Sequence, residues 1–400
     1  MAKFAFINIP FHAHINPTLP VVQELVNQGH DVVYYLTEKY KGAVEATGAK
    51  FYGYESEMER NTSRFQEHSQ SLMVPILMIG ESLSVIPQIL ESVRAEQPDC
   101  LIYSDPLCFS GRFIAQILGL AEVASRVTFI GDSRTKRFFQ THQIAPEEIK
   151  LFRDYSEQLC ARYPIASFTI ADIFMHKAPL NIVFLPRSFQ INGDTYGEGY
   201  CFVGPSIGPR ARVADFPFEK LGKDPIIYIT LGTVYNDNAP FFRTCFAAFA
   251  DLPVQVVIGA GGRSVESLHL GPQPANFLVR DYVPQVDVMK RASLLIGTGS
   301  STTLAEAMFC GLPIITIPQS ISQEGAAKRV AELGLGLLLE KEAVTVTSLR
   351  DAAMQLLRDP AYRQRALQMQ KDALNAGGAH AAAEALRDFV CLKVESHSTS

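Results

Sequence analysis

The 400-residue chain lacks several features that mark other classes of protein. It has no tryptophan, and its seven cysteines lie far apart, with no Cys-x-x-Cys pair among them. An odd, scattered set of cysteines indicates a reduced, cytoplasmic protein and not a disulfide or zinc framework. The 36 basic and 41 acidic residues form no long run of one sign, which argues against a nucleic-acid groove and against a polybasic membrane patch.

Uninterrupted apolar stretches long enough to cross a bilayer are absent as well. The N-terminus passes directly into a short apolar run, without the hydrophobic region and cleavage site of a signal peptide. The apolar segment 71–90 is interrupted by two prolines and a glutamate, so it predicts a buried or pocket-lining helix. We therefore expect a cytoplasmic protein with no membrane span and no nucleic-acid partner, present as a monomer or homodimer.

Strand and helix patterns alternate in two successive blocks of the chain. The apolar run 4–9 predicts a buried parallel strand. Asn16 is expected to cap the helix that follows, with Pro17 in its first turn and Gly29 at its end. The further strands expected are 31–36, 100–103 and 181–185 and, after the Gly- and Pro-rich segment 203–209, the runs 226–231, 254–258, 294–296 and 314–317.

This pattern predicts an α/β fold of two doubly wound, Rossmann-like domains whose parallel sheets face each other across a cleft. Ligands of such sheets bind beyond the carboxyl ends of the strands, where the strands of the second block run into glycine-containing or polar loops. The expected boundaries are 1–208 for the N-terminal domain, 209–222 for a linker, 223–376 for the C-terminal domain, 377–392 for a helix that packs back on the N-terminal domain, and 393–400 for a flexible tail.

Six short segments in a fixed order cover nearly the whole chain. They are HINPTL at 14–19, FVGPSI at 202–207, LGTV at 231–234, DYVPQ at 281–285, EAM with GLP between 306 and 313, and RVAELGLG at 329–336. These segments resemble the macrolide and antibiotic glycosyltransferases of family GT1, which have the GT-B fold. The resemblance implies an N-terminal acceptor domain and a C-terminal nucleotide-sugar domain.

The activity that the resemblance implies is an inverting transfer of a sugar from a UDP- or dTDP-linked donor. The acceptor would be a hydroxyl of a small apolar natural product, such as a macrolide or polyketide. The nucleotide sugar would be a co-substrate, with no tightly bound cofactor and no metal.

The acceptor side rests on His14, because a neutral imidazole near physiological pH suits the removal of a hydroxyl proton. The resemblance implies that His14 is the base and that Asp105, which follows the strand at 100–103, orients it and balances its charge. His12 is the nearby competitor for the role of base. The residues expected to line the acceptor pocket are Phe11, His12, Met73 and Phe138.

The donor side resembles the family only in part. The resemblance places Tyr282 under the nucleotide base where the family usually has tryptophan, and Glu306 on the ribose hydroxyls. Thr298 stands where the family has a histidine that binds the diphosphate, and Ser322 stands where it has an acid that holds sugar hydroxyls. The other donor contacts expected are Gly232, Thr233, Gln285, Gly299, Ser300, Ser301, Thr302, Thr303 and Gln323.

Hydroxyl groups beside a helix N-terminus still suit an anion, so the segment 297–303 is expected to bind a phosphate, with a ligand-free capped turn as the alternative. The departures leave a second function open: a GT-B protein with an eroded donor site that does acid–base chemistry on, or only binds, a polyketide-like ligand. A nucleotide-sugar epimerase is a third, which the motif at 14–17 disfavours.

Overall fold

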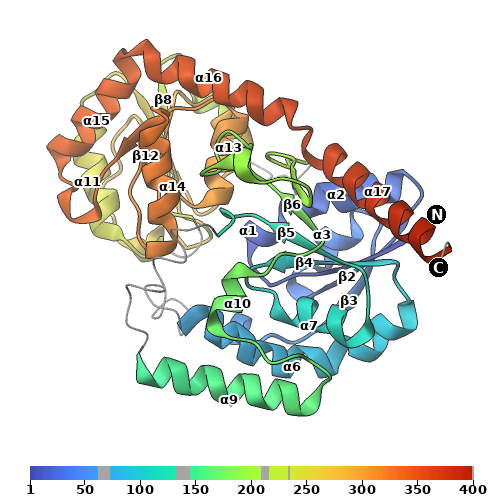
Figure 1. The fold of residues 1–400 in the computed structure, drawn as a ribbon. Coiled ribbons are helices and arrows are strands. Elements are labelled where there is room, and N and C mark those ends of the chain that lie inside the picture. Colours follow the sequence, from blue (N-terminus) through green and yellow to red (C-terminus); the bar gives the residue numbers. More distant parts are fainter. Residues whose placement is uncertain (62–72, 132–144, 209–215, 233–234, 399–400) are drawn as a thin grey trace. The chain divides into compact units, whose positions relative to one another are not determined.

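A computed structural model describes residues 1–61, 73–131, 145–208, 216–232 and 235–398. The chain divides into two compact units. Unit 1 comprises Met1–Pro209 and Ala376–Ser400, and unit 2 comprises Arg210–Asn375. Figure 1 shows the elements of both along the chain.

Unit 1 is built on a seven-stranded parallel sheet with the order β3-β2-β1-β4-β5-β6-β7. Its central strands are buried along nearly their whole length, as their apolar sequences predict for a sheet that is covered on both faces. The strands are β1 (Lys3–Ile7), β2 (Asp31–Leu36), β3 (Lys50–Gly53), β4 (Cys100–Asp105), β5 (Glu122–Arg126), β6 (Leu180–Val183) and β7 (Tyr200–Phe202).

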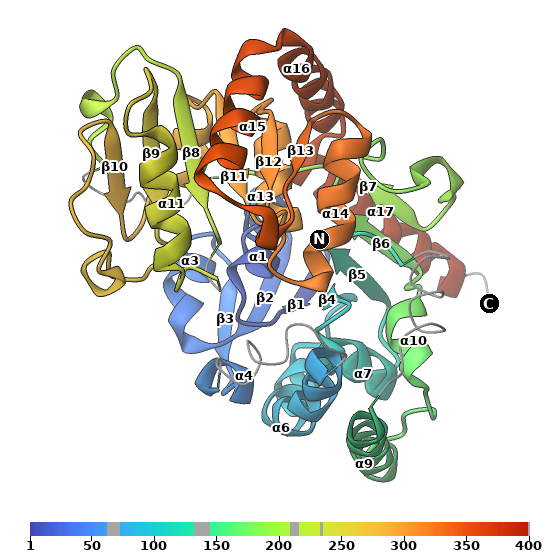
Figure 2. The same ribbon diagram turned by 90° about the vertical axis from the view of Figure 1, so that its left-hand side faces the viewer.

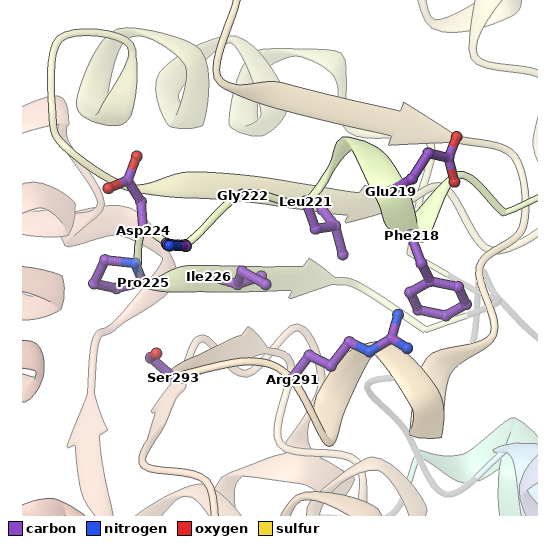
Figure 3. Close-up of a pocket in the computed structure, with 10 residues that line it drawn as sticks. Phe218, Glu219, Leu221, Gly222, Asp224, Pro225, Ile226, Arg291 and Ser293 are labelled. Atoms are coloured by element: carbon purple, nitrogen blue, oxygen red, sulfur yellow. The ribbon is translucent and has the colours of Figure 1, made fainter.

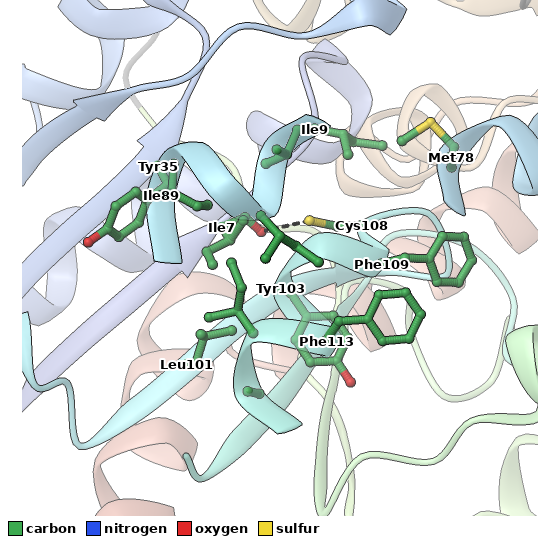
Figure 4. Packing of buried hydrophobic residues seen from close by; sticks show 14 of the residues in the cluster. Ile7, Ile9, Tyr35, Met78, Ile89, Leu101, Tyr103, Cys108, Phe109 and Phe113 are labelled. Carbon is green, nitrogen blue, oxygen red and sulfur yellow. Dashed lines mark hydrogen bonds between the residues drawn. The ribbon is translucent and has the colours of Figure 1, made fainter. Parts of the chain in front are cut away.

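Two hydrophobic clusters cover the two faces of this sheet. Alternate residues of β4 enter different clusters, because successive side chains of a strand point to opposite faces. The first face, part of which Figure 4 shows, is packed by α4 (Glu57–Arg60), α6 (Met73–Glu96), α7 (Phe109–Leu118), α9 (Pro146–Arg162) and α10 (Ile170–Met175). The second is packed by α2 (Thr18–Asn27), α3 (Lys41–Glu45) and α17 (Gly378–Ser398).

One local expectation is wrong, and the terminal helix is longer than expected. The first helical segment is a single turn, α1 (His12–Ile15), and α2 starts afresh at Thr18, so Asn16 ends α1 and Pro17 stands at the N-cap of α2. The terminal helix α17 continues to Ser398, and alanine-rich turns of it lie against α2. The expected tail from 393 is therefore helical as far as the structure describes it.

One helix of the described chain, α6, is long and apolar enough to cross a bilayer by length and composition alone. Half of its most apolar window is buried inside the protein, and its residues form much of the first hydrophobic cluster. The core helix of a globular protein passes the same test.

Unit 2 has a six-stranded parallel sheet with the order β10-β9-β8-β11-β12-β13. Its strands are β8 (Ile226–Thr230), β9 (Gln255–Gly259), β10 (Phe277–Arg280), β11 (Leu294–Gly297), β12 (Ile314–Thr316) and β13 (Gly336–Leu338). Figure 2 shows α11 (Ala239–Phe249) lying over β8 and β9, where it shares a hydrophobic cluster with α15 (Val346–Arg358). The other helices described are α12 (Gln285–Met289), α13 (Ser301–Phe309), α14 (Ile321–Glu332) and α16 (Pro360–Asn375).

Both sheets reverse their strand order once. In unit 1 the reversal lies between β1 and β4, and in unit 2 it lies between β8 and β11. Loops that leave neighbouring strands on the two sides of such a point diverge and leave room for a ligand. His14 follows β1, Asp105 ends β4, and Gly232 and Thr298 follow β8 and β11. The other predicted donor residues include Tyr282 and Gln285 after β10 and Ser322 and Gln323 after β12.

Candidate active site

His14 lies directly beyond the carboxyl end of β1, in the single turn α1. Its side chain is buried, with 7% exposure, and its Nδ1 lies 2.6 Å from Oγ of Ser104 at the end of β4. Asn8 fixes the backbone at the same place, because its amide donates to the His14 carbonyl at 3.0 Å and to the Tyr34 hydroxyl at 2.9 Å. The reversal point of unit 1 thus holds an oriented imidazole.

Asp105 does not contact this imidazole, contrary to what the resemblance implied. Ser104 and Asp105 are consecutive residues of β4, so their side chains point to opposite faces of the sheet. Asp105 is paired across the sheet with Arg126 of β5, and the Arg126 guanidinium donates to its Oδ1 at 2.5 Å. Because both side chains are only 5% exposed, this is a buried ion pair. Ser104 occupies the position next to His14 that was predicted for Asp105.

Burial sets the protonation state of His14. Loss of solvent lowers the pKa of the imidazole to about 4, so the ring is neutral near pH 7. Nδ1 is within hydrogen-bond distance of the Ser104 hydroxyl, and Nε2 makes no hydrogen bond to the described residues. In the tautomer with its proton on Nδ1, Nε2 is the nitrogen that can take a proton. The arrangement is suited to general-base chemistry.

The residues predicted for the acceptor pocket are only partly described. Phe11 lies beside His14, with ring centroids 6.2 Å apart, and Met73 packs against the first hydrophobic cluster. His12 meets the ring of Tyr40 edge-on at 5.1 Å. Phe138 lies outside the described residues. Phe11 is thus a neighbour of the imidazole, and His12 lies in the same short helix as His14.

Two cavities of the described chain contain none of the predicted site residues. The larger, of about 640 Å³, lies in unit 2 between the segment before β8 and Arg291, whose guanidinium stacks on Phe218 (Figure 3). The other, of about 390 Å³, lies in unit 1 between α7 and α10.

The donor residues predicted at the reversal point of unit 2 follow β8 and β11, which are neighbours in the sheet. Gly232 and Gly299 have φ angles of +78° and +82°, a conformation that favours glycine. Ser300 stands at the N-cap of α13 but accepts no hydrogen bond from it through its side chain, and instead donates to Thr303 at 3.0 Å. Thr298 is buried, with 3% exposure. Thr233 lies outside the described residues.

Glu306 and Gln285 contact each other. Glu306 is 1% exposed and accepts a hydrogen bond from the Gln285 amide, whose oxygen accepts one from the Tyr228 hydroxyl at 2.9 Å. The carboxylate predicted for the ribose is therefore covered by Gln285 in this conformation. Tyr282 is 54% exposed, so its ring is accessible for stacking.

The loop after β12 contains the last predicted donor residues. Ser322 is exposed, and its hydroxyl lies 2.9 Å from that of Ser320. Gln323 is buried and accepts a hydrogen bond from the backbone of Gln319 at 2.8 Å. Gln323 thus stabilises the loop, whereas Ser322 faces solvent.

Four residues of these contacts were not predicted from the sequence: Ser104, Arg126, Asn8 and Tyr228. The period of two along β4 was a signal for the first, since it allows only one of Ser104 and Asp105 to face His14. Arg126 had no such signal, because β5 was not among the expected strands.

Known proteins resemble this chain over nearly its whole length. The family described as erythromycin biosynthesis protein CIII-like, C-terminal domain, matches residues 243–388. NDP-glycosyltransferase YjiC of Bacillus subtilis is 35% identical over 390 residues, which cover 96% of this chain and 97% of the relative. Demethyllactenocin mycarosyltransferase of Streptomyces fradiae is 30% identical over 404 residues, 98% of this chain and 87% of the relative.

The chain belongs to this glycosyltransferase family. The crystal structure of CalG4, the calicheamicin glycosyltransferase, matches it with a TM-score of 0.80 and 27% identity, over 98% of each chain. The glycosyltransferase of kitacinnamycin matches with a TM-score of 0.82 and 25% identity, over 97% of this chain and 98% of the other. The resemblance inferred from the six segments is confirmed, as is the GT-B fold class with its two parallel, Rossmann-like sheets.

Proposed function

We propose that this glycosyltransferase moves a sugar, with inversion, from a UDP- or dTDP-linked donor to a hydroxyl of a small apolar natural product. The observation that carries the proposal is the buried, neutral His14 at the reversal point of unit 1, with its Nδ1 held by Ser104. The names of the relatives support the acceptor class: one acts on demethyllactenocin, and another is an oleandomycin glycosyltransferase. Unit 1 is then the acceptor unit and unit 2 the donor unit.

Nε2 of His14 takes the proton of the acceptor hydroxyl as its oxygen attacks the anomeric carbon. The new carbon–oxygen bond forms on the face opposite the diphosphate, and the bond from the anomeric carbon to the phosphate oxygen breaks. The nucleoside diphosphate leaves with that electron pair. Direct attack from the opposite face inverts the anomeric configuration, and general-base catalysis contributes roughly 10² to 10⁴ in rate.

The donor half of the proposal rests on α13. Its N-terminus presents backbone N–H groups and the hydroxyls of Ser300 and Ser301, and such a helix end favours a diphosphate. Two solved structures of this fold, glycosyltransferase VinC and spinosyn rhamnosyltransferase SpnG, are complexes with thymidine diphosphate. The exposed ring of Tyr282 supplies the surface for stacking on the nucleobase.

The test replaces His14 and, as a matched control, His12 on the same turn. We expect His14→Ala to lower kcat by roughly 10² or more, because only the base is lost. Calorimetry should find the affinity for UDP or dTDP within about twofold of the wild type, since these ligands bind unit 2. Wild-type turnover in His14→Ala would show that the base is misassigned, and a large loss confined to His12→Ala would transfer the role to His12.

A further inference from the structure

The imidazole of His14 has a neutral partner on Nδ1. The Oγ of Ser104 is buried and lies 2.6 Å from that nitrogen, and no other side-chain hydrogen bond of Ser104 is found among the described residues. Asp105, the adjacent acid, is held on the other face by Arg126. Arg126 is held in turn by Asn181 at 2.8 Å and by the carbonyl of His176 at 2.7 Å.

The side chains around His14 supply no charge that replaces a carboxylate. Among the described residues, the titratable side chains hydrogen-bonded to the segment from Ile7 to Pro10 are Tyr34, Tyr40, Tyr54 and Cys108. Burial raises the pKa of Tyr34, Tyr54 and Cys108, so these three are uncharged near pH 7. On α1 itself, His12 packs on Tyr40. On β4, the neighbours Tyr103 and Asp105 point to the opposite face. The one partner that orients the ring is therefore a hydroxyl.

We propose that Ser104 is the positioning residue of His14 and orients its ring as Asp105 was predicted to do, without balancing its charge. This inference rests on the proposed role of His14 as the base. A base needs its lone pair on Nε2, so Nδ1 carries the proton in the resting ring and donates it to Ser104 Oγ. When Nε2 has taken the acceptor's proton, both nitrogens carry one, and Ser104 remains the acceptor for Nδ1–H.

The chain offers a matched control for removing this hydroxyl. Ser125 of β5 is the parallel-register partner of Ser104, on the same face of the sheet, and its buried Oγ has no hydrogen-bond partner in the described part of the chain. Ser104→Ala and Ser125→Ala thus delete the same atoms from neighbouring buried positions. Only the first removes a contact to the imidazole.

Steady-state kinetics with both substrates separates the two variants. We expect Ser104→Ala to lower kcat roughly tenfold to a hundredfold, with KM values within about twofold of the wild type. Ser104→Thr, which keeps the hydroxyl, should recover most of that loss, and Ser125→Ala should leave kcat within about twofold. Equal kcat values for Ser104→Ala and Ser125→Ala would overturn the proposal. If Ser104→Ala lowers kcat but His14→Ala remains active, the assignment of His14 as the base is wrong.

Nitrogen NMR of the His14 ring tests the same proposal without turnover. The wild-type ring should carry its proton on Nδ1 near pH 7, and Ser104→Ala should shift population toward the tautomer protonated on Nε2. A wild-type ring protonated on Nε2 contradicts the proposal. A merely structural role for Ser104 would leave the tautomer unchanged.

The pH profile supplies a third readout. Ser104→Asp places a carboxylate on Nδ1, which favours the charged ring, so the acidic limb of kcat/KM should move to higher pH by about one unit or more. Because the base acts only when unprotonated, the sign of this shift is fixed. If the acidic limb of kcat/KM does not move in a folded Ser104→Asp enzyme, the side chain at position 104 does not interact with the His14 ring.

Discussion

Each unit has one point at which the strand order of its sheet reverses, and the residues at the two points differ. In unit 1 the turn beyond β1 supplies the titratable ring of His14, and the carboxyl end of β4 supplies the hydroxyl of Ser104, in direct contact with it. In unit 2 the loops beyond β8 and β11 contain glycines and residues with hydroxyl side chains, and Thr298 stands where the resemblance places a histidine. The same strand order therefore fixes where a ligand binds, but single residues at the loop starts decide what chemistry each site can do.

The supports of the two sites differ as well. A buried ion pair between Asp105 and Arg126 lies at the reversal point of unit 1. In unit 2, hydrogen bonds join Glu306, Gln285 and Tyr228 in the segment that is predicted to bind the donor. Burial raises the pKa of Asp105, and the Arg126 guanidinium opposes that rise. Removing the guanidinium leaves a buried acid with no ionic partner.

The largest expected effect is therefore on stability, from Arg126→Ala. This variant breaks the pair and two further hydrogen bonds, to the Asn181 side chain of β6 and to the His176 carbonyl, so we expect the free energy of unfolding to fall by about 3–5 kcal/mol. Urea denaturation measures it. Lys328→Ala, which breaks the exposed pair with Glu324 in unit 2, is the control and should cost less than about 1 kcal/mol. Equal effects of the two variants would contradict a buried ion pair.

A second effect follows from the buried ring of unit 1. The pKa of His14 is about 4 in the folded chain, against about 6.5 when unfolded, so below pH ~6.5 the unfolded state binds a proton that the folded state does not. The free energy of unfolding should fall by about 3 kcal/mol from this group as the pH drops through that interval. His14→Gln should lack this component, as urea titrations between about pH 7 and pH 4.5 can measure.

The exposed His380 provides a control of opposite sign. Its hydrogen bond to Glu24 raises its pKa, so the stability that it contributes is present at acidic pH and is lost as the pH rises through the folded value. His380→Gln should therefore make the protein relatively less stable in acid. A pH dependence of His14→Gln equal to that of the wild type would mean that the ring is not buried in its neutral form.

Many of the strands, and the position of His14 beyond the first of them, were predictable from the sequence because they depend on local patterns. The apolar runs predicted β1, β2, β4 and β8, and the motif at 14–19 led to His14 at the end of the first strand. The short strands β3, β5, β7, β10 and β13 were missed, since runs of three to five residues with mixed polarity carry little periodic signal.

The partner of His14 was mispredicted for a related reason. Asp105 matched the family by position, but its direction depends on where β4 ends and on what its neighbour strand places beside it. Arg126 comes from β5, which the sequence had not revealed, and it is the cross-strand partner of Asp105. In the same way, nothing local to Glu306 indicated that Gln285 covers it. Contacts between distant segments decided both cases.

The smallest expected effect is a change in the diphosphate affinity of unit 2. It comes from Thr298→His, which restores the residue that the resemblance places at this position. A histidine that donates to a diphosphate contributes roughly 1.5–3 kcal/mol, so UDP or dTDP should bind roughly tenfold to a hundredfold more tightly. Calorimetry with the diphosphate and with the bare nucleoside separates this contact from base stacking, because only the diphosphate should gain. Thr298 is 3% exposed, so thermal unfolding must first establish that the larger ring is accommodated. A folded variant with unchanged diphosphate affinity would show that the α13 N-terminus and its hydroxyls already provide the hydrogen bonds that the phosphates need. The absence of a histidine at position 298 would then not weaken diphosphate binding by unit 2.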